Sequence, residues 1–175
     1  MNDFKLIDWN NSLTYIKLFL PFVSSFCISL IPIFRTNKNS GINVKFRPPG
    51  FVFGIVWTIL YILFGFAWIL NKNNTMINIF YSLNLFLLLL WIVIYNGLKY
   101  KTGGVFIITL TIINTLNLII ISNNTSKLFL TPLFGWLLLA LLLNSFEVQF
   151  LDKNYNNEQY FPIAEDINEI LKDEK

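Results

Sequence analysis

Long apolar runs separated by short polar segments dominate the pattern of this chain. A helix needs about 20 apolar residues to cross about 30 Å of hydrocarbon, and five runs come close to that length. Because the runs are continuous rather than alternating, and backbone groups in lipid must bond internally, they predict helices and not strands of a barrel. The pattern predicts an all-α integral membrane protein, a bundle of five transmembrane helices over residues 13–34, 51–70, 76–98, 105–121 and 128–150.

The two ends of the chain differ in character. The first run contains two prolines and is longer than the apolar core of a signal peptide, and no A-x-A-like cleavage site follows it, so we expect it to be retained. Residues 1–151 are predicted to form the transmembrane domain and residues 152–175 a polar, acidic tail. Apolar residues at helical spacing after Pro162 predict a short amphipathic helix there, either solvated or a partner site.

The connections indicate how the helices are arranged. Those after the second, third and fourth runs are short, which predicts that consecutive helices are antiparallel neighbours. The connections after the first and third runs carry six of the 13 basic residues, among them Arg35, Lys45, Arg47, Lys99 and Lys101, and the tail begins with Lys153. Since lysine and arginine favour the cytosolic side, the predicted C-terminus is cytosolic and the N-terminus is not, in a membrane that the sequence does not identify.

Composition narrows the chemistry. The chain of 175 residues is 55% hydrophobic and 13% charged, with one cysteine and no histidine. Disulfide frameworks, zinc sites and histidine-based acid/base catalysis therefore lack their residues, and no metal site or required cofactor is predicted. The net charge of +3 comes from basic residues in connections, which gives nucleic-acid binding no support.

The stretch FRPPGFVFGIVWTILY combines a helix start with an aromatic stripe. Pro48 and Pro49 fix where the second helix begins, because a proline in the first turn loses no internal hydrogen bond. Phe53, Trp57 and Tyr61 then recur every four residues, and the stripe continues to Gly65 and Trp68. It either packs helices, with Gly50 and Gly54 permitting close approach, or lines a ligand site.

The aromatic pattern recurs in two other runs. Trp91 and Tyr95 lie one turn apart in the third, and Trp136 precedes Asn144 by two turns in the fifth. Tryptophans well inside a span lie away from the interfacial belt, and their indole N–H groups need partners. Three of them on three helices predict a cavity with flat walls for a large planar ligand, with Asn144 as a ligand contact or an interhelical bond.

These residues resemble a known family, the tryptophan-rich sensory protein and translocator protein family (TspO, also called the peripheral benzodiazepine receptor). KFRPPGFVFGIVWTILY resembles its signature at the second helix, and LTPLFGWLLLALLLN that of its fifth, over about residues 13–151 in all. The chain departs from the pattern in several places. Phenylalanine replaces tryptophan at Phe46 and Phe51, and Leu88, Val93 and Leu133 replace an asparagine, a proline and a tyrosine.

The resemblance implies a membrane receptor or translocator that binds tetrapyrroles such as protoporphyrin or haem, and possible homodimers. A porphyrin is expected rather than cholesterol, because no basic residue follows Tyr155 at the spacing of the sterol motif. Without histidine, haem would be held by its face and edges rather than through its iron. The implied ligand wall is Phe53, Trp57, Tyr61, Trp91, Trp136 and Asn144, with Phe46, Arg47, Pro48 and Pro49 at the pocket mouth.

Two alternatives stay open. Family resemblance includes light-dependent breakdown of porphyrin, in which Trp57 and Trp136 would act as redox partners. A structural or assembly protein without a small-molecule ligand is the other, its aromatic residues merely packing helices against one another and against membrane lipid.

Overall fold

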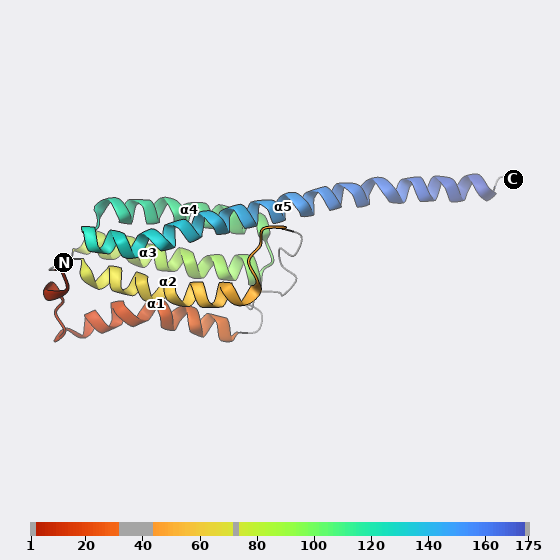
Figure 1. Ribbon diagram of the computed structural model, residues 1–175. Helices are drawn as coiled ribbons and strands as arrows, with labels where there is room; N and C mark the ends of the chain where they lie inside the picture. The colour runs from red at the N-terminus through yellow and green to blue at the C-terminus, as the bar shows by residue number, and fades with distance from the viewer. Residues whose placement is uncertain (1–2, 32–43, 72–73, 174–175) are drawn as a thin grey trace.

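The computed structural model describes residues 3–31, 44–71 and 74–173, with side chains described as far as Gln149. Every regular element in these ranges is helical, and five helices are long and apolar enough to span a membrane (Figure 1). The prediction of an all-α five-helix membrane protein is confirmed. The elements are η1 (Asp3–Leu6), α1 (Ser12–Leu30), α2 (Gly50–Leu70), α3 (Thr75–Ile92), the π-helix η3 (Val93–Gly97), α4 (Lys101–Ile121) and α5 (Asn124–Asp173).

Helix boundaries agree with the apolar runs within one residue except at four places. Helix α1 ends at Leu30, and residues 32–34 of the first run lie outside the described residues. Helices α4 and α5 each begin four residues before the predicted start, because polar and small residues extend their first turns. Helix α5 does not stop at residue 150 and restart after Pro162 but continues to Asp173, extending beyond the bundle (Figure 1). A proline removes one helical bond, and in water the freed carbonyl can bond to solvent.

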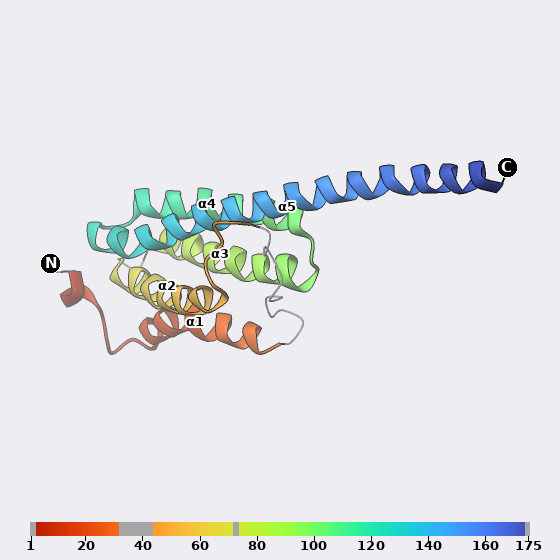
Figure 2. The ribbon, with the colours of Figure 1, turned by 45° about the vertical axis from the view of Figure 1, so that its right-hand side comes forward.

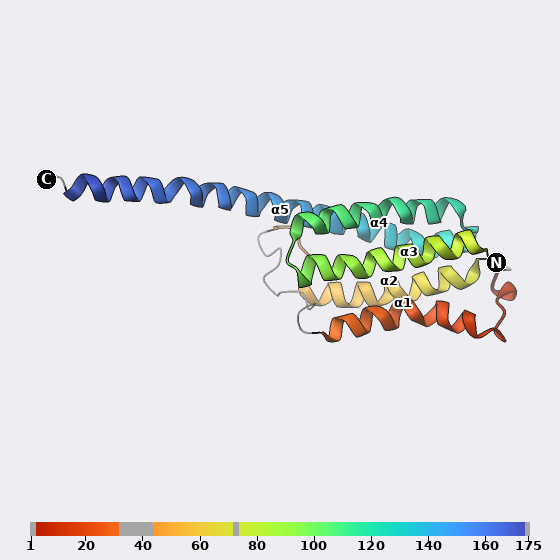
Figure 3. The ribbon, with the colours of Figure 1, turned by 180° about the vertical axis from the view of Figure 1, so that it is seen from behind.

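The helices do not all pack in chain order. Helix α2 packs against α1 and α5, while α4 packs against α3 and α5, and α1 lies at the edge beside α2 (Figure 3). The prediction of neighbouring consecutive helices is right for α3 with α4 and for α4 with α5. It is also right for α2 with α3: their backbones lie farther apart, but their side chains pack, as Phe64 does on Tyr81 at 5.2 Å and Trp68 on Tyr81 at 5.5 Å. Large rings fill the space between these two helices.

Local signals in the sequence set the helix starts. Pro49 is the N-cap of α2, in an extended conformation, as the proline pair predicts. Asn11 and Asn74 cap α1 and α3 by accepting bonds from the backbone N–H groups of Leu13 and Met76. The termini lie at opposite ends of the bundle, as an odd number of spans requires (Figure 1).

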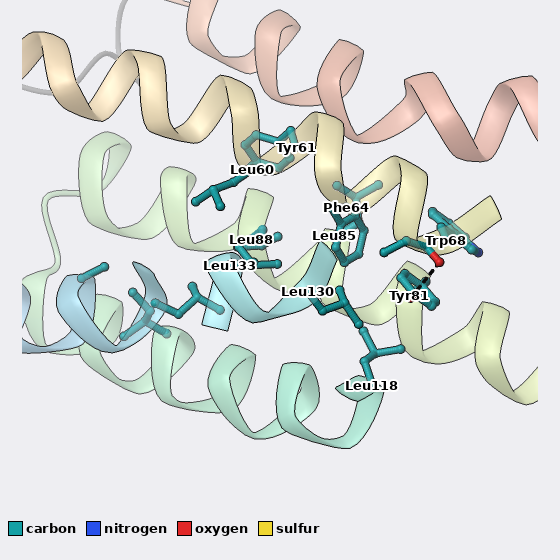
Figure 4. Close-up of a cluster of buried hydrophobic side chains, with 14 residues drawn as sticks. Leu60, Tyr61, Phe64, Trp68, Tyr81, Leu85, Leu88, Leu118, Leu130 and Leu133 are labelled. Carbon is teal, nitrogen blue, oxygen red and sulfur yellow. Dashed lines mark hydrogen bonds between the residues drawn. The ribbon is translucent and has the colours of Figure 1, made fainter. Parts of the chain in front are cut away.

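The core lies where α2, α3, α4 and α5 meet (Figure 4). Phe64 of α2 and Tyr81 of α3 are almost fully buried there, with ring centroids 5.2 Å apart. Leu118 of α4 and Leu130 of α5 close it from the other side. Many large apolar side chains, such as Ile55 and Phe106, instead face outward, as expected where lipid is the solvent.

Gly65 allows the closest helix contact. A Cβ atom there would lie 2.2 Å from the backbone oxygen of Leu18, so α1 and α2 touch at this point. Gly50 and Gly54, which the helix-packing alternative gave as a place of close approach, face open space instead. Eleven residues turn about 1,100°, which is three turns and about 20°, so Gly54 and Gly65 lie on nearly the same face of α2. The difference lies along the helix: the α1 backbone reaches α2 beside Gly65 and not beside Gly54.

Candidate aromatic ligand site

The three predicted tryptophans come together from three helices. The Trp57 ring of α2 lies 5.9 Å from that of Trp91 in α3 and 6.4 Å from that of Trp136 in α5, centroid to centroid. Phe53 contacts Trp136 edge to face at 5.6 Å, and Tyr61 lies 5.8 Å from Trp57. These five residues are called the aromatic cluster below. Its rings contact one another directly, with the separations that aromatic pairs favour.

Burial differs within the aromatic cluster. Tyr61 is buried in the core, whereas Phe53, Trp57, Trp91 and Trp136 are half-buried. Each of these four rings therefore keeps part of its surface accessible. That accessible surface is what a flat ligand could cover without opening the core.

Several buried N–H donors near the aromatic cluster have no partner. The indole nitrogens of Trp91 and Trp136 are buried without a hydrogen bond, and so is the side-chain nitrogen of Asn144, a residue only 3% exposed. By contrast, the indole of Trp68, at the far end of α2, donates to Asn78 Oδ1 at 3.0 Å. Buried donors are normally paired, so three orphans near one cluster mark a place where an acceptor is missing.

Loop one is the connection between α1 and α2, of which the structure describes residues 44–49. The residues predicted at the mouth lie at this end of the bundle, called the loop-one end, where residues 44–49 run between α5 and α2 (Figure 2). The Phe46 ring packs edge to face on Phe146 of α5 at 5.3 Å. The guanidinium carbon of Arg47 lies 5.4 Å from the Phe53 ring centroid, which places a cation beside the aromatic cluster. Pro48 is half-buried and Pro49 exposed at the start of α2.

Three residues outside the predicted ligand wall adjoin the aromatic cluster, and of these only Tyr95 is singled out in the sequence analysis, for its spacing from Trp91. Tyr95 stacks on Trp91 with centroids 5.0 Å apart, and its hydroxyl bonds to the carboxylate of Glu147 on α5. Lys101, the first residue of α4, lies 3.6 Å from Glu147 Oε1. The signal was present: Glu147 is the one acidic residue within the run 128–150, and ionisable groups inside a span are rare and functional.

Departures from the family pattern lie in the core. Leu88 and Leu133, which replace an asparagine and a tyrosine, are each 2% exposed and pack in the main apolar cluster. One turn before Leu88, the side-chain oxygen Oδ1 of Asn84 accepts hydrogen bonds from the side chains of Asn114 and Thr115 in α4. The polar group in this part of α3 therefore holds two helices together. Val93, where the family has proline, begins the π-helix η3.

Two other features of the surface lie apart from this site. A shallow surface depression lies on the outer face of α3, lined by residues from Thr75 to Phe86 and away from the tryptophans. Among the described residues, no group of three histidine, cysteine, aspartate or glutamate side chains is placed to hold a metal ion.

Comparison with known proteins identifies the family of the chain. The sequence profile of the TspO/MBR family matches residues 19–148. The "Tryptophan-rich protein TspO" of Archaeoglobus fulgidus is 35% identical over 106 residues, which cover 57% of this chain and 69% of that protein. The matched range contains the whole aromatic cluster, together with Asn144 and Glu147. The chain is an integral, multi-pass membrane protein that belongs to the TspO/MBR family.

Proposed function

We propose that the protein is a membrane receptor or translocator for a large planar hydrophobic ligand, of which a tetrapyrrole such as protoporphyrin is the class that fits best. The ligand stacks on the accessible surfaces of Trp57, Trp91 and Trp136. Each ring-on-ring contact contributes about 0.5–1.5 kcal/mol beyond the burial of apolar area. The family supports a role in ligand binding in general terms, and the identity of the ligand is part of the proposal.

One observation carries the proposal: the unpartnered indole nitrogens of Trp91 and Trp136 and the unpartnered amide of Asn144. Each buried donor without an acceptor costs about 1–3 kcal/mol. An acceptor-bearing ligand would recover it. Tetrapyrroles offer such acceptors as carboxylate oxygens and ring nitrogens on a flat apolar body.

Arg47 supplies the complementary charge. It lies beside Phe53 at the loop-one end, where an arginine fork suits a carboxylate at the edge of a macrocycle. Haem would bind in the same way, by its face and its carboxylates, because the chain has no histidine to hold the iron. In the topology that we propose, this end of the bundle and the C-terminus face the cytosol.

The first experiment is a dark titration of the detergent-purified protein with protoporphyrin, followed by tryptophan fluorescence. The variants are Trp57→Phe and Trp136→Phe. Trp9→Phe is the matched control, since Trp9 lies before α1 and is 47% exposed. We expect saturable quenching that both cluster variants weaken and the control does not. Linear quenching, or equal quenching in every variant, means nonspecific partitioning and refutes a tetrapyrrole site.

The same samples separate the two rival functions. If illumination forms a product from bound protoporphyrin, and Trp57→Phe or Trp136→Phe abolishes it, the protein is a light-dependent porphyrin-degrading enzyme. A folded protein that responds to neither tetrapyrroles nor sterols is a structural or assembly protein.

A further inference from the structure

Tyr95, Lys101 and Glu147 form a polar cluster that joins three helical elements at the loop-one end of the bundle. Tyr95 lies in the π-helix η3, Lys101 begins α4, and Glu147 lies on α5. Glu147 is 9% exposed, and the side chain of Lys101 is 16% exposed. Buried charges of this kind are costly unless they are paired, and a π-turn inside a helix is often found at functional sites.

The polar groups of this Tyr95–Lys101–Glu147 cluster bond to one another. One carboxylate oxygen of Glu147 accepts the Tyr95 hydroxyl, and the other faces the Lys101 ammonium at 3.6 Å. The ammonium also donates to the backbone oxygen of Tyr95 at 3.3 Å and lies 3.5 Å from the centroid of its ring. These contacts hold the ammonium group between the Glu147 carboxylate and Tyr95. Lys101 is therefore committed to groups within the protein.

The cluster is also continuous with the proposed site. Tyr95 stacks on Trp91, and a Cβ atom at Gly104 would lie 3.0 Å from the Tyr95 ring and 3.6 Å from Trp91 Nε1, so both rings pack on α4. Asn144 precedes Glu147 by one turn of α5. Two cations thus lie beside rings of this region, Arg47 beside Phe53 and Lys101 beside Tyr95, and Glu147 already pairs with the second.

We propose that Glu147 is a specificity-determining residue, an internal carboxylate that occupies Lys101 and leaves Arg47 as the anchor for acidic ligands. This inference rests on the proposed function. It predicts that the wild-type protein binds a diacid porphyrin more tightly than the neutral diester, and that this difference in affinity comes from Arg47 alone. Replacing Glu147 by its neutral isostere releases Lys101 as a second anchor.

The test compares protoporphyrin with its dimethyl ester, which has the same ring and no carboxylates, by dark quenching titration. In Glu147→Gln, we expect the ratio of the two affinities to shift about tenfold toward the diacid, the size of one charge-assisted hydrogen bond. The double variant Glu147→Gln/Lys101→Gln should return to the wild-type ratio. Asp8→Asn removes the same charge before α1, at the other end of the bundle, and should leave the ratio unchanged.

A folded Glu147→Gln protein with an unchanged ratio overturns the inference, even when both porphyrins bind saturably. If neither porphyrin binds saturably to the wild type, the proposed function itself fails. If Glu147→Gln does not fold, the variants Arg47→Gln and Lys101→Gln test the inference instead. The inference requires the diacid preference to be lost in Arg47→Gln and kept in Lys101→Gln, and the reverse result overturns it.

Discussion

Trp57 and Trp91 lie with ring centroids 5.9 Å apart, between two helices whose backbones hardly approach each other. The ring pair thus replaces close helix packing along the boundary between α2 and α3. Aromatic rings can part and be covered by another flat ring at a smaller loss than interlocked helix backbones. We therefore expect a ligand to enter at this boundary rather than between α2 and α1, which touch at Gly65.

The first prediction concerns two tryptophans that differ in their indole N–H. Trp91→Phe keeps an aromatic ring but removes a donor that has no partner. We expect affinity for protoporphyrin to fall about five- to tenfold, which corresponds to the loss of one hydrogen bond, with little loss of thermal stability. Trp68→Phe removes a donor bonded to Asn78 and should do the opposite, lowering stability by about 1–2 kcal/mol at unchanged affinity.

Thermal melts and quenching titrations on the same preparations check both halves of this comparison. If Trp91→Phe is as destabilising as Trp68→Phe and binds normally, the unpaired donor has no part in binding.

The second prediction concerns two glycines of α2. Gly65→Ala should destabilise the protein by about 1–3 kcal/mol, because its Cβ atom would overlap the Leu18 backbone and push α1 away. Gly54→Ala meets nothing within 4 Å and should be neutral or stabilise the helix by up to about 1 kcal/mol. Thermal unfolding in one detergent measures the difference. Equal effects of the two substitutions would show that α1 does not contact α2 at Gly65.

The tryptophan and glycine comparisons show which features of the structure can be predicted from the sequence alone. Hydropathy predicts all five spans, and spacing brings Trp57, Trp91 and Trp136 to one place, because both depend on properties repeated along each run. The partner of Gly65 and the pairing of Tyr95 with Glu147 are different. They depend on which faces of neighbouring helices meet and how far along each helix they touch, which the pattern within one run does not fix. Glu147 stands out by its charge, but nothing in the sequence names its partners.

A third prediction separates the two ends of the bundle. Tyr81 is fully buried at the end opposite loop one, where its hydroxyl donates to the Ala67 backbone oxygen at 3.1 Å and accepts from Asn71 at 2.9 Å. Tyr81→Phe should cost about 1–2 kcal/mol of stability, since Asn71 loses a partner, and should leave ligand affinity unchanged. Tyr100→Phe, at a residue 60% exposed, should change neither. A loss of affinity in Tyr81→Phe would mean that both ends contribute to the site.

The last prediction concerns loop one as a cover for the site. Phe46 is the described loop residue whose ring reaches α5, where it packs on Phe146 at 5.3 Å, and the Arg47 next to it lies over Phe53. Losing this ring pair forfeits about 0.5–1.5 kcal/mol of the contact that holds the loop down. We therefore expect Phe46→Ala to speed the release of bound protoporphyrin about two- to tenfold, measured by stopped-flow fluorescence. Because the rings of the aromatic cluster are untouched, the amplitude of quenching should stay the same.

Phe51→Ala is the matched control, since Phe51 is 71% exposed on α2, and it should not change the rate. Equal release rates in all three proteins would show that loop one does not limit ligand exit, and would leave the boundary between α2 and α3 as the route.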